Sequence, residues 1–438
     1  MGQPAAPLTE RNYVAPLVLV TSLFFLWALG VNLNDVLIPH LKKAFHLTDF
    51  RSSLIQTAFF GGYFLAALPA GRIMERIGYK RGIVLGLLIG AMGTILFVPA
   101  ASVRVYGFFL FALFVMACGQ SFLEVGANPY VIILGPPGSS ERRLNLAQSF
   151  NSVGAALTPG IGAAFILTNE EYSPAQLAAM TPRQIEAYQI AEASTVRGPY
   201  LAITCVFLLV ALMIYFARLP EIHEPSDSKT PDTSQPRWSA VVAHPRLGKG
   251  VIAPFFYVGA QVGVASFIIR FVQHTSPGTS EKLAANYLKF HLLGFMIGRF
   301  AGSAVMKIIS APRLLSIFAA GALISILLAI STSGLAPIWA VVFIGFFHSI
   351  MFPTIFALSI KGLGSYTKRG SSLLVMSIIG GAMIPALMGY ISDASSIQRA
   401  FIVPLACYVY VLYFALRGYR PGAVDQARGT VPVGVEAR

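Results

Sequence analysis

The sequence predicts an all-α integral membrane protein with twelve transmembrane helices arranged in two pseudo-symmetric six-helix halves. Of the 438 residues, 55% are hydrophobic and only 11% are charged, whereas soluble domains carry about 25% charged residues. Apolar runs recur at about 20 residues, the length of a helix that crosses a bilayer, and not as the alternating segments of about ten residues typical of a membrane β-barrel. One long polar stretch, 218–248, separates these runs into six and six.

The apolar runs locate the individual helices. The predicted spans are 12–38, 53–75, 82–101, 105–131, 146–168, 199–217, 249–272, 284–308, 312–331, 335–360, 370–391 and 399–416. The first run is too long for the apolar core of a signal peptide, and it ends in Asn and Asp instead of small residues suited to cleavage. It is therefore expected to remain as the first helix, and the even number of spans places both termini on one side.

The basic residues predict which side that is. The net charge of +14 would also suit a nucleic-acid partner, but Lys and Arg lie mostly in short loops between apolar runs, so no nucleic acid is expected. The loop residues that share one side are Arg72, Arg76, Lys80, Arg81, Arg142, Arg143, Lys307, Arg313, Lys361, Lys368 and Arg369. By the positive-inside rule this side is cytoplasmic, and both termini should be cytoplasmic too.

The polar segments predict the domain organisation. An N-terminal half at 1–217 and a C-terminal half at 249–416 are joined by a cytoplasmic linker at 218–248, whose Pro, Ser, Asp and Thr content is typical of a flexible connection. The extracytoplasmic loop 169–198 has helical spacing that predicts a short surface helix. The polar tail 417–438 is expected to be disordered.

A charged motif lies between the second and third predicted helices, where the sequence reads GRIMERIGYKRG. Its Gly71, Glu75, Arg76, Gly78 and Arg81 resemble the loop signature of the major facilitator superfamily, G-x-x-x-D-R-x-G-R-R, with Glu in place of Asp. Six plus six helices about a central linker is also the plan of that superfamily, which binds substrate at mid-membrane. The resemblance implies a gating role, in which these charges latch one conformation. Positive-inside charge alone would explain the arginines but not the glycine spacing.

Two carboxylates, Asp35 and Glu124, lie inside apolar runs, and asparagines accompany both. An ionisable side chain within a bilayer is costly and therefore usually has a function or a partner. One interpretation is a structural ion pair, for which Arg299 and Arg270 are at suitable depth. The other is proton coupling, in which a carboxyl takes up a proton outside and releases it inside.

Further polar side chains in the apolar helices predict a site for a hydroxyl-rich substrate. Amides and carboxylates satisfy sugar hydroxyls, but any single amide also has the ordinary use of a helix–helix hydrogen bond. The predicted substrate-binding residues are Asp35, Glu124, Asn32, Gln56, Asn128, Gln148, Asn151, Tyr257, Gln261 and Asn286. Asn128 precedes Pro129, which interrupts helical hydrogen bonding, and Gln148 and Asn151 lie one turn apart on one face. Gln120, His291 and His348 are further polar groups in these helices, and His348 suits either a titrating group or a hydrogen-bonded neutral histidine. Phe59, Phe60 and Tyr63 suit either stacking against a sugar or ordinary helix packing.

The chain from about residue 20 to 415 resembles the fucose–galactose–glucose:proton symporter family. The resemblance is carried by NLNDVLIPHLKKAF, SLIQTAFFGGYF, LEVGANPYVIILGP, RLNLAQSFNSVGA and FPTIFALSIKGLG, among other segments. It implies that the acids of the N-L-N-D and L-E-x-x-A-N-P segments, here Asp35 and Glu124, are the proton and substrate groups. It also implies that the polar pair of the N-L-A-Q-x-F-N segment, Gln148 and Asn151, belongs to the site.

The resemblance leaves the sugar open. Glu124 and the N-L-A-Q segment favour L-fucose, whereas Pro39, His40 and the basic loop favour glucose and galactose. Met351-Phe352 stands where a Gln-Tyr pair is found in fucose carriers. Relatives of this kind also carry mannose or N-acetylglucosamine, and distant ones use sodium. The expected partners are a monosaccharide, a proton or sodium, and membrane lipid, and the expected state is a monomer in a bacterial cytoplasmic membrane.

The sequence argues against two other functional classes. A sugar-sensing receptor of the same fold would need neither intramembrane acid nor the charged loop. An enzyme is not expected, because the chain shows no nucleophile–base constellation, no P-loop G-x-x-x-x-G-K-[ST] and no metal-ligand spacing around its three cysteines. No cofactor and no metal are predicted.

Overall fold

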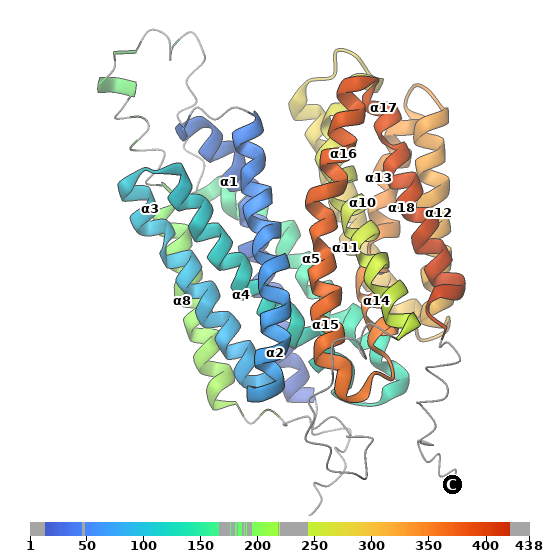
Figure 1. Cartoon of the computed structure of the whole chain (residues 1–438). Helices are drawn as coiled ribbons and strands as arrows, with labels where there is room; N and C mark the ends of the chain where they lie inside the picture. The colour runs from blue at the N-terminus through green and yellow to red at the C-terminus, as the bar shows by residue number, and fades with distance from the viewer. Residues whose placement is uncertain are drawn as a thin grey trace, which may run out of the picture. The chain divides into compact units, whose positions relative to one another are not determined.

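The computed structural model describes residues 14–45, 49–165, 195–217 and 244–420, with short pieces at 176, 180–181, 183–185, 188, 190 and 219. Side chains are described over the same residues except 29–31, 33–53, 159–165 and 365. Helices make up nearly all of this part of the chain, which contains no β-strand (Figure 1). The all-α class predicted from the apolar runs is confirmed.

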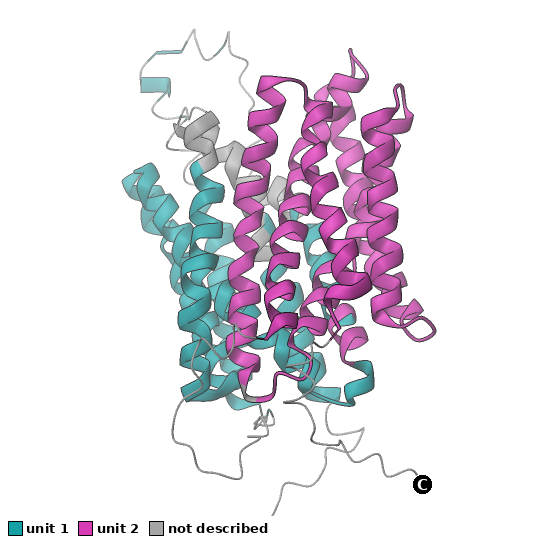
Figure 2. Cartoon of the chain, turned by 45° about the vertical axis from the view of Figure 1, so that its right-hand side comes forward, with its two compact units in different colours: residues 1–139, 146–222 teal, residues 140–145, 223–438 magenta. Residues whose placement is uncertain are grey.

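The chain separates into two compact units (Figure 2). Unit 1 comprises Met1–Ser139 and Leu146–Ile222, and unit 2 comprises Ser140–Asn145 and His223–Arg438. The division passes through helix α5 (Ser140–Phe165), whose start belongs to unit 2 and whose remainder belongs to unit 1. The predicted limits of the two halves rest on hydropathy alone and stay a prediction.

Unit 1 is built around two helical arms that are joined at a single glycine. In chain order its helices are α1 (Val14–Phe45), α2 (Asp49–Ile95), α3 (Phe97–Val103), α4 (Tyr106–Ile133), the 3-10 turn η1 (Pro137–Ser139), α5 from Leu146, and α8 (Arg197–Phe216). Helix α2 packs along both α4 and α8, and α3 leads from its end into α4. The polar groups on α4 are therefore enclosed by apolar helices.

Glycines allow α2 and α4 to approach closely. A Cβ atom on Gly93 would lie 2.2 Å from the backbone nitrogen of Met116, and one on Gly119 would lie 2.3 Å from that of Gly90. Small residues are typical of membrane helix crossings, where close van der Waals contact drives association. Since Gln120 follows Gly119 directly, this crossing also sets where the polar residues of α4 lie.

Helix α2 consists of two helical arms that meet at Gly78. This residue has φ 81° and ψ 171°, a backbone conformation that is essentially restricted to glycine. The sequence predicts separate helices at 53–75 and 82–101 with a loop between them. The structure also has two helical arms here, but helical residues continue up to Gly78 from both sides, so a single glycine with positive φ takes the place of the predicted loop.

Unit 2 contains the remaining helices. They are α10 (Pro245–Thr275), α11 (Glu281–Val305), α12 (Ala311–Ser331), α13 (Ala336–His348), α14 (Met351–Ile360), η2 (Gly364–Tyr366), α15 (Thr367–Met376), η3 (Ser377–Ile379), α16 (Gly380–Ala394), α17 (Ile397–Ala400), α18 (Ile402–Tyr413) and η4 (Phe414–Gly418). Helix α10 packs against α11, α14, α16 and α18. Capping residues set some of the starts: the Ser280 hydroxyl accepts from the N–H of Leu283, 3.3 Å away, at the start of α11.

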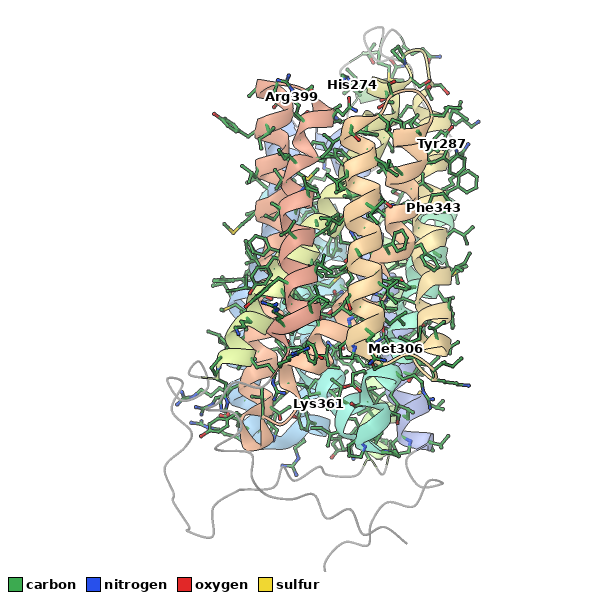
Figure 3. All side chains as sticks on the ribbon, turned by 90° about the vertical axis from the view of Figure 1, so that its right-hand side faces the viewer. His274, Tyr287, Met306, Phe343, Lys361 and Arg399 are labelled. Carbon is green, nitrogen blue, oxygen red and sulfur yellow. The ribbon has the colours of Figure 1, made fainter. Side chains whose placement is uncertain are left out.

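The connections of unit 2 alternate between its two ends. Figure 3 shows His274 and Arg399 at one end of its helices and Met306 and Lys361 toward the other, with Phe343 between them. The basic loops that follow α11 and α14 therefore lie at the same end, as helices that cross a bilayer in alternating directions require.

Some predicted boundaries are wrong. Helix α1 continues to Phe45 although its predicted end is 38. The predicted span 335–360 agrees with the apolar segment Ala336–Ile360, but this segment is interrupted between α13 and α14, because Pro353 lacks the N–H that would continue the helical pattern. The predicted loop 169–198, linker 218–248 and tail 417–438 lie mostly outside the described residues.

Within the described residues, eight helical segments are long and apolar enough to cross a membrane. One of them, Leu54–Val103, has 50 residues. At 1.5 Å per residue such a helix would be more than twice as long as a bilayer core of about 30 Å, so it accounts for two of the predicted spans. Helix α1 contributes a shorter apolar part, Val14–Ala28. The chain is a multi-pass membrane protein.

Candidate functional site

A stripe of buried polar side chains runs along α4 in unit 1. Gln120, Glu124 and Asn128 follow one another at intervals of four residues, which places them on one face of the helix. All three are buried, with exposed fractions of 0%, 9% and 0%. Pro129 follows the last of them and interrupts the hydrogen bonding of α4 there. The predicted acid Glu124 thus lies at the centre of a polar stripe within apolar helices.

Aromatic residues of α2 face this stripe. The Tyr63 hydroxyl donates to Gln120 Oε1 at 3.2 Å, and the Ser121 hydroxyl donates to the Tyr63 carbonyl at 3.1 Å. The Glu124 carboxyl is close enough to Tyr63 for an electrostatic interaction. Phe59 packs on Tyr63 with 5.2 Å between ring centroids. Tyr63 is therefore a polar contact of the stripe as well as an aromatic surface.

Helix α5 supplies a second set of amides. Gln148 Nε2 donates to Asn128 Oδ1 at 3.1 Å, joining α5 to α4. One turn later, Asn151 Nδ2 donates to the carbonyl of Phe24 at 3.2 Å, joining α5 to α1. The pair that the sequence places on one face of a helix thus makes contacts to two different helices of unit 1.

Helix α1 carries the other predicted acid. Asn32 Nδ2 donates to the Ala28 carbonyl of its own helix at 2.7 Å. The backbone of Asp35 is helical and lies one turn further along the same face, but its side chain is outside the described residues. Gln56, at the start of α2, is half-buried. The roles of these residues stay predictions.

The predicted residues of unit 2 have separate surroundings. The Tyr257 hydroxyl donates to the His348 carbonyl at 2.9 Å and is fully buried. Gln261 is half-buried, one turn further along α10. Asn286 lies near the start of α11, where its Oδ1 accepts from the exposed Lys289 Nζ at 3.3 Å.

The two arginines considered as partners for the acids have contacts within unit 2. Arg299 Nε donates to the Ser349 carbonyl at 2.9 Å, and the guanidinium lies 4.4 Å from the Phe295 ring centroid. Arg270 approaches Asp393 at 4.0 Å, with both side chains more than half exposed. Each arginine therefore has at least one partner inside unit 2, and the ion-pair interpretation of the two acids stays untested.

The predicted gating residues surround the kink of α2. Gly71 is buried in the first arm and Gly78 forms the kink, while Arg76 and Arg81 on either side are exposed and Glu75 is half-buried. The gating role itself stays a prediction.

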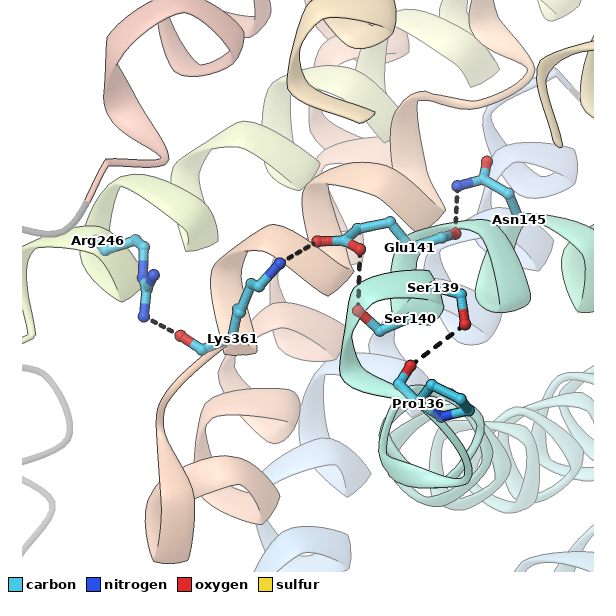
Figure 4. A network of polar contacts seen from close by, with 7 residues as sticks. All are labelled: Pro136, Ser139, Ser140, Glu141, Asn145, Arg246 and Lys361. Carbon is cyan, nitrogen blue, oxygen red and sulfur yellow. Dashed lines mark hydrogen bonds and ion pairs between the residues drawn. The ribbon is translucent and has the colours of Figure 1, made fainter. Parts of the chain in front are cut away.

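An ion pair that the sequence does not predict joins α14 to the start of α5. Lys361 Nζ donates to Glu141 Oε1 at 2.7 Å, and the Ser140 hydroxyl donates to Glu141 Oε2 at 2.9 Å (Figure 4). Arg246 donates to the Lys361 carbonyl. Asn145 Nδ2 donates both to the Glu141 carbonyl at 2.8 Å and to the Thr354 hydroxyl at 3.0 Å. These contacts explain why the first turns of α5 belong to unit 2.

The environment of Glu141 lowers its pKa. Burial alone would raise the pKa of this carboxyl, but hydrogen bonds from Lys361, its own backbone and Ser140, with the charge of Lys361, bring it below the ordinary value of 4.5. The carboxyl is therefore ionised at neutral pH. The sequence predicts only a positive-inside charge for Lys361, and nothing in the local pattern around Glu141 indicates a partner 220 positions away.

These observations define a class of protein: a polytopic all-α membrane protein with polar groups buried inside its apolar helices. Comparison with known proteins identifies the family. Residues 20–379 match the profile of the Major Facilitator Superfamily. A glucose/galactose transporter of Brucella abortus is 42% identical over 94% of this chain and 95% of its own length. The L-fucose-proton symporter of Escherichia coli is 41% identical over 93% of each chain.

The fold agrees with this relationship. Two crystal structures of FucP, the fucose:proton symporter of E. coli, superpose with a TM-score of 0.85 at 39% and 40% identity, covering 93% of this chain and 99% of that chain. The chain therefore belongs to the major facilitator superfamily and, within it, to the fucose–galactose–glucose:proton symporter family. It has the superfamily fold and is a transporter, not an enzyme.

Proposed function

We propose that this protein imports a hexose together with a proton across a bacterial cytoplasmic membrane, with L-fucose as the first sugar to test. The observation that carries this proposal is the carboxyl of Glu124, buried on α4 among hydrogen-bonding side chains. A charge in apolar surroundings is costly, and protonation removes that charge. Glu124 can therefore exist in two states whose burial costs differ, as a proton-coupled carrier requires.

The polar stripe supports a sugar as the co-substrate. A hexose presents hydroxyl groups in several directions, each of which needs a donor or an acceptor when water is excluded. The amides of Gln148 and Asn128 and the carboxyl of Glu124 offer both kinds of group on two neighbouring helices, with aromatic rings at Phe59 and Tyr63. In this proposal Glu124 carries the proton, and Asp35 contributes to coupling or to sugar binding.

The identity of the sugar has a second candidate. The relatives divide at nearly equal identity between a glucose/galactose transporter, at 42%, and an L-fucose-proton symporter, at 41%. Glucose and galactose are therefore the alternative substrates, followed by mannose and N-acetylglucosamine. The N-terminus, the loop around Gly78 and the C-terminus are proposed to face the cytoplasm.

The experiment follows the external pH of a weakly buffered suspension of expressing cells. L-fucose, D-glucose, D-galactose, D-mannose and N-acetylglucosamine are added in turn, first without and then with sodium. Alkalinisation by one sugar is expected, because each imported sugar removes a proton from the medium. Glu124→Gln should abolish the pH change, while Glu281→Gln, a change at an exposed acid in the first turn of α11, should leave it intact.

Two results would contradict the proposal. Accumulation of sugar that requires sodium and leaves the pH unchanged would replace the proton by sodium as the coupling ion. If no sugar exchanges across the membrane of vesicles that contain the purified protein, sugar transport is ruled out. A carrier exchanges internal for external substrate, whereas a sugar-sensing receptor does not.

A further inference from the structure

Unit 2 contains a break in the middle of an apolar segment. The segment Ala336–Ile360 is long enough to cross a bilayer, yet α13 ends at His348 and α14 begins at Met351. Pro353 has no N–H, so the carbonyl of Ser349, four residues earlier, loses its ordinary helical donor. The N–H of Thr354 pairs with the Ile350 carbonyl at 3.2 Å, so regular bonding resumes at once. The break is confined to one turn.

Side chains from two other helices donate hydrogen bonds to the carbonyl groups at this break. Arg299 Nε, from α11, donates to the Ser349 carbonyl at 2.9 Å. The Tyr257 hydroxyl, from α10, donates to the His348 carbonyl at the same distance. At membrane depth no water replaces such donors, so carbonyl groups released by a helix break must be satisfied by protein. These two bonds therefore stabilise the broken form of the helix.

The His348 side chain adds a third link. It is fully buried, and its Nε2 lies 2.6 Å from the Tyr408 hydroxyl of α18. Its ring also packs edge-on against those of Tyr257 and His291, at 5.8 and 5.9 Å between centroids. The last residue of α13 is thus held by α10, α11 and α18 together.

Helix α14 connects the break to the hydrogen bond and the ion pair at the start of α5. Directly after the break it presents Thr354 to Asn145, and Lys361 at its end pairs with Glu141. A change in direction at the break would therefore move both contacts to the start of α5.

We propose that Tyr257, Arg299 and the His348–Tyr408 pair are positioning residues that hold the break at Ser349–Ile350 and thereby set the direction of α14 during transport. The proposal rests on the transport function proposed above. It gives Tyr257 a positioning role in place of the sugar contact predicted from the sequence: these side chains act through the two carbonyl groups and the His348 ring. Their removal should consequently slow turnover more than it weakens sugar binding.

The first test is Tyr257→Phe, which keeps the aromatic ring and removes only the donor to the His348 carbonyl. Tyr200→Phe is the matched control, because Tyr200 is fully buried in unit 1 and its hydroxyl has no hydrogen-bond partner within the described residues. Loss of one buried hydrogen bond corresponds to a factor of about five to ten. Tyr257→Phe should lower the rate of sugar counterflow by about that factor, with the half-saturation concentration within about twofold.

The second test asks whether Arg299 acts through the break. Pro353→Ala restores the N–H that can pair with the Ser349 carbonyl within the helix. Arg299→Met should therefore reduce counterflow about tenfold in the original chain but less than about threefold in the Pro353→Ala background. Equal losses in both backgrounds would mean that Arg299 has a role unrelated to the Ser349 carbonyl and would overturn this part of the proposal.

A third measurement does not depend on transport. Amide hydrogen exchange of the peptide that spans residues 346–355 should be faster in Tyr257→Phe and Tyr408→Phe than in Tyr200→Phe. Unchanged exchange would overturn the positioning role even if transport is altered. If the original chain transports no sugar in counterflow, the proposed transport function is wrong. The amide hydrogen exchange measurement still tests whether Tyr257 and Tyr408 hold the break.

Discussion

Asn128 and Gln148 form the side-chain hydrogen bond that joins α4 to α5, and both are buried. Asn128 lies on the polar stripe of α4, and Gln148 reaches it from α5. Removing one therefore leaves the other partly unsatisfied in an apolar interior, which costs about 1–3 kcal/mol. At the scale of single residues, such pairs decide how the polar side chains of unit 1 are oriented.

Asn128→Leu should raise the half-saturation concentration for the transported sugar by about fivefold or more, because it removes one amide from the proposed site and disturbs Gln148. Sugar uptake by cells at fixed pH measures this. The exchanged pair Asn128→Gln with Gln148→Asn keeps both amides and should recover part of the affinity. An unchanged half-saturation concentration in Asn128→Leu would show that the stripe does not meet the sugar.

Glu141 predicts a pH dependence with a definite sign. Its pKa is below the ordinary 4.5 in the folded protein, so the Glu141–Lys361 pair stabilises the fold fully above about pH 4.5 and is lost as the pH falls through the folded pKa. The difference in melting temperature between the original chain and Glu141→Gln should be constant from about pH 8 to 6 and shrink below about pH 4.5.

The control for that series is Glu281→Gln, a change at an exposed acid in the first turn of α11. It should shift the melting temperature little at any pH. A difference for Glu141→Gln that already disappears between pH 8 and 6 would contradict the lowered pKa of this carboxyl.

Among the elements, α2 depends most on a single position. Its two arms meet at Gly78, where φ is 81° and ψ is 171°. A Cβ atom there would meet no other atom within 4 Å, so any cost of substitution comes from the backbone and not from crowding. The predicted gating residues sit on both sides of this kink, and their relative placement follows from it.

Gly78→Ala should lower stability by about 1–3 kcal/mol, because the conformation is one that residues with a Cβ atom rarely adopt. Thermal unfolding of the purified protein in detergent measures this. Gly61→Ala is the matched control in the same helix: it also has open space around its Cβ position but no positive φ, and should be neutral or slightly stabilising. Equal effects of the two changes would show that the kink carries no strain cost.

Across the whole molecule, the close crossing of α2 and α4 holds unit 1 together. A Cβ atom on Gly93 would lie 2.2 Å from the backbone of α4, a distance that only a shift of one helix could relieve. Because α2 also packs along α8, such a shift would also disturb the packing between α2 and α8. Overpacking of a well-packed interior typically costs about 1–3 kcal/mol and sometimes more.

Gly93→Ala should therefore reduce the yield of folded, monodisperse protein, whereas Gly107→Ala, in the first turn of α4 with open space around it, should not. Size-exclusion chromatography of the detergent-solubilised proteins compares them. A normal yield and melting temperature for Gly93→Ala would mean that the crossing is looser than the structure shows.

Much of the fold could be predicted from local sequence. Apolar runs reflect the free energy of transferring each segment into a bilayer, which is a property of the segment itself. They therefore located α4, α8, α10 and α12 to within a few residues. They did not predict that the junction between the two arms of α2 is a single residue, Gly78, or that the span Ala336–Ile360 is interrupted between α13 and α14.

The candidate site was predictable only in part. Glu124 stands out from sequence because a carboxylate in an apolar run is rare, and Asn128 and Gln148 because of their proline and their spacing. The pairing of Tyr63 with Gln120, and of Glu141 with Lys361, joins residues 57 and 220 positions apart. No local pattern encodes such pairs.

By itself, then, the sequence determined the membrane class, most helix positions, the family and the buried acid, since each depends on the composition and order of short segments. Only the tertiary structure decided which buried groups share hydrogen bonds, where α13 gives way to α14, and that the first turns of α5 belong with unit 2. The physical reason is that these features depend on contacts between helices distant in the chain, and their energies exist only once those helices pack.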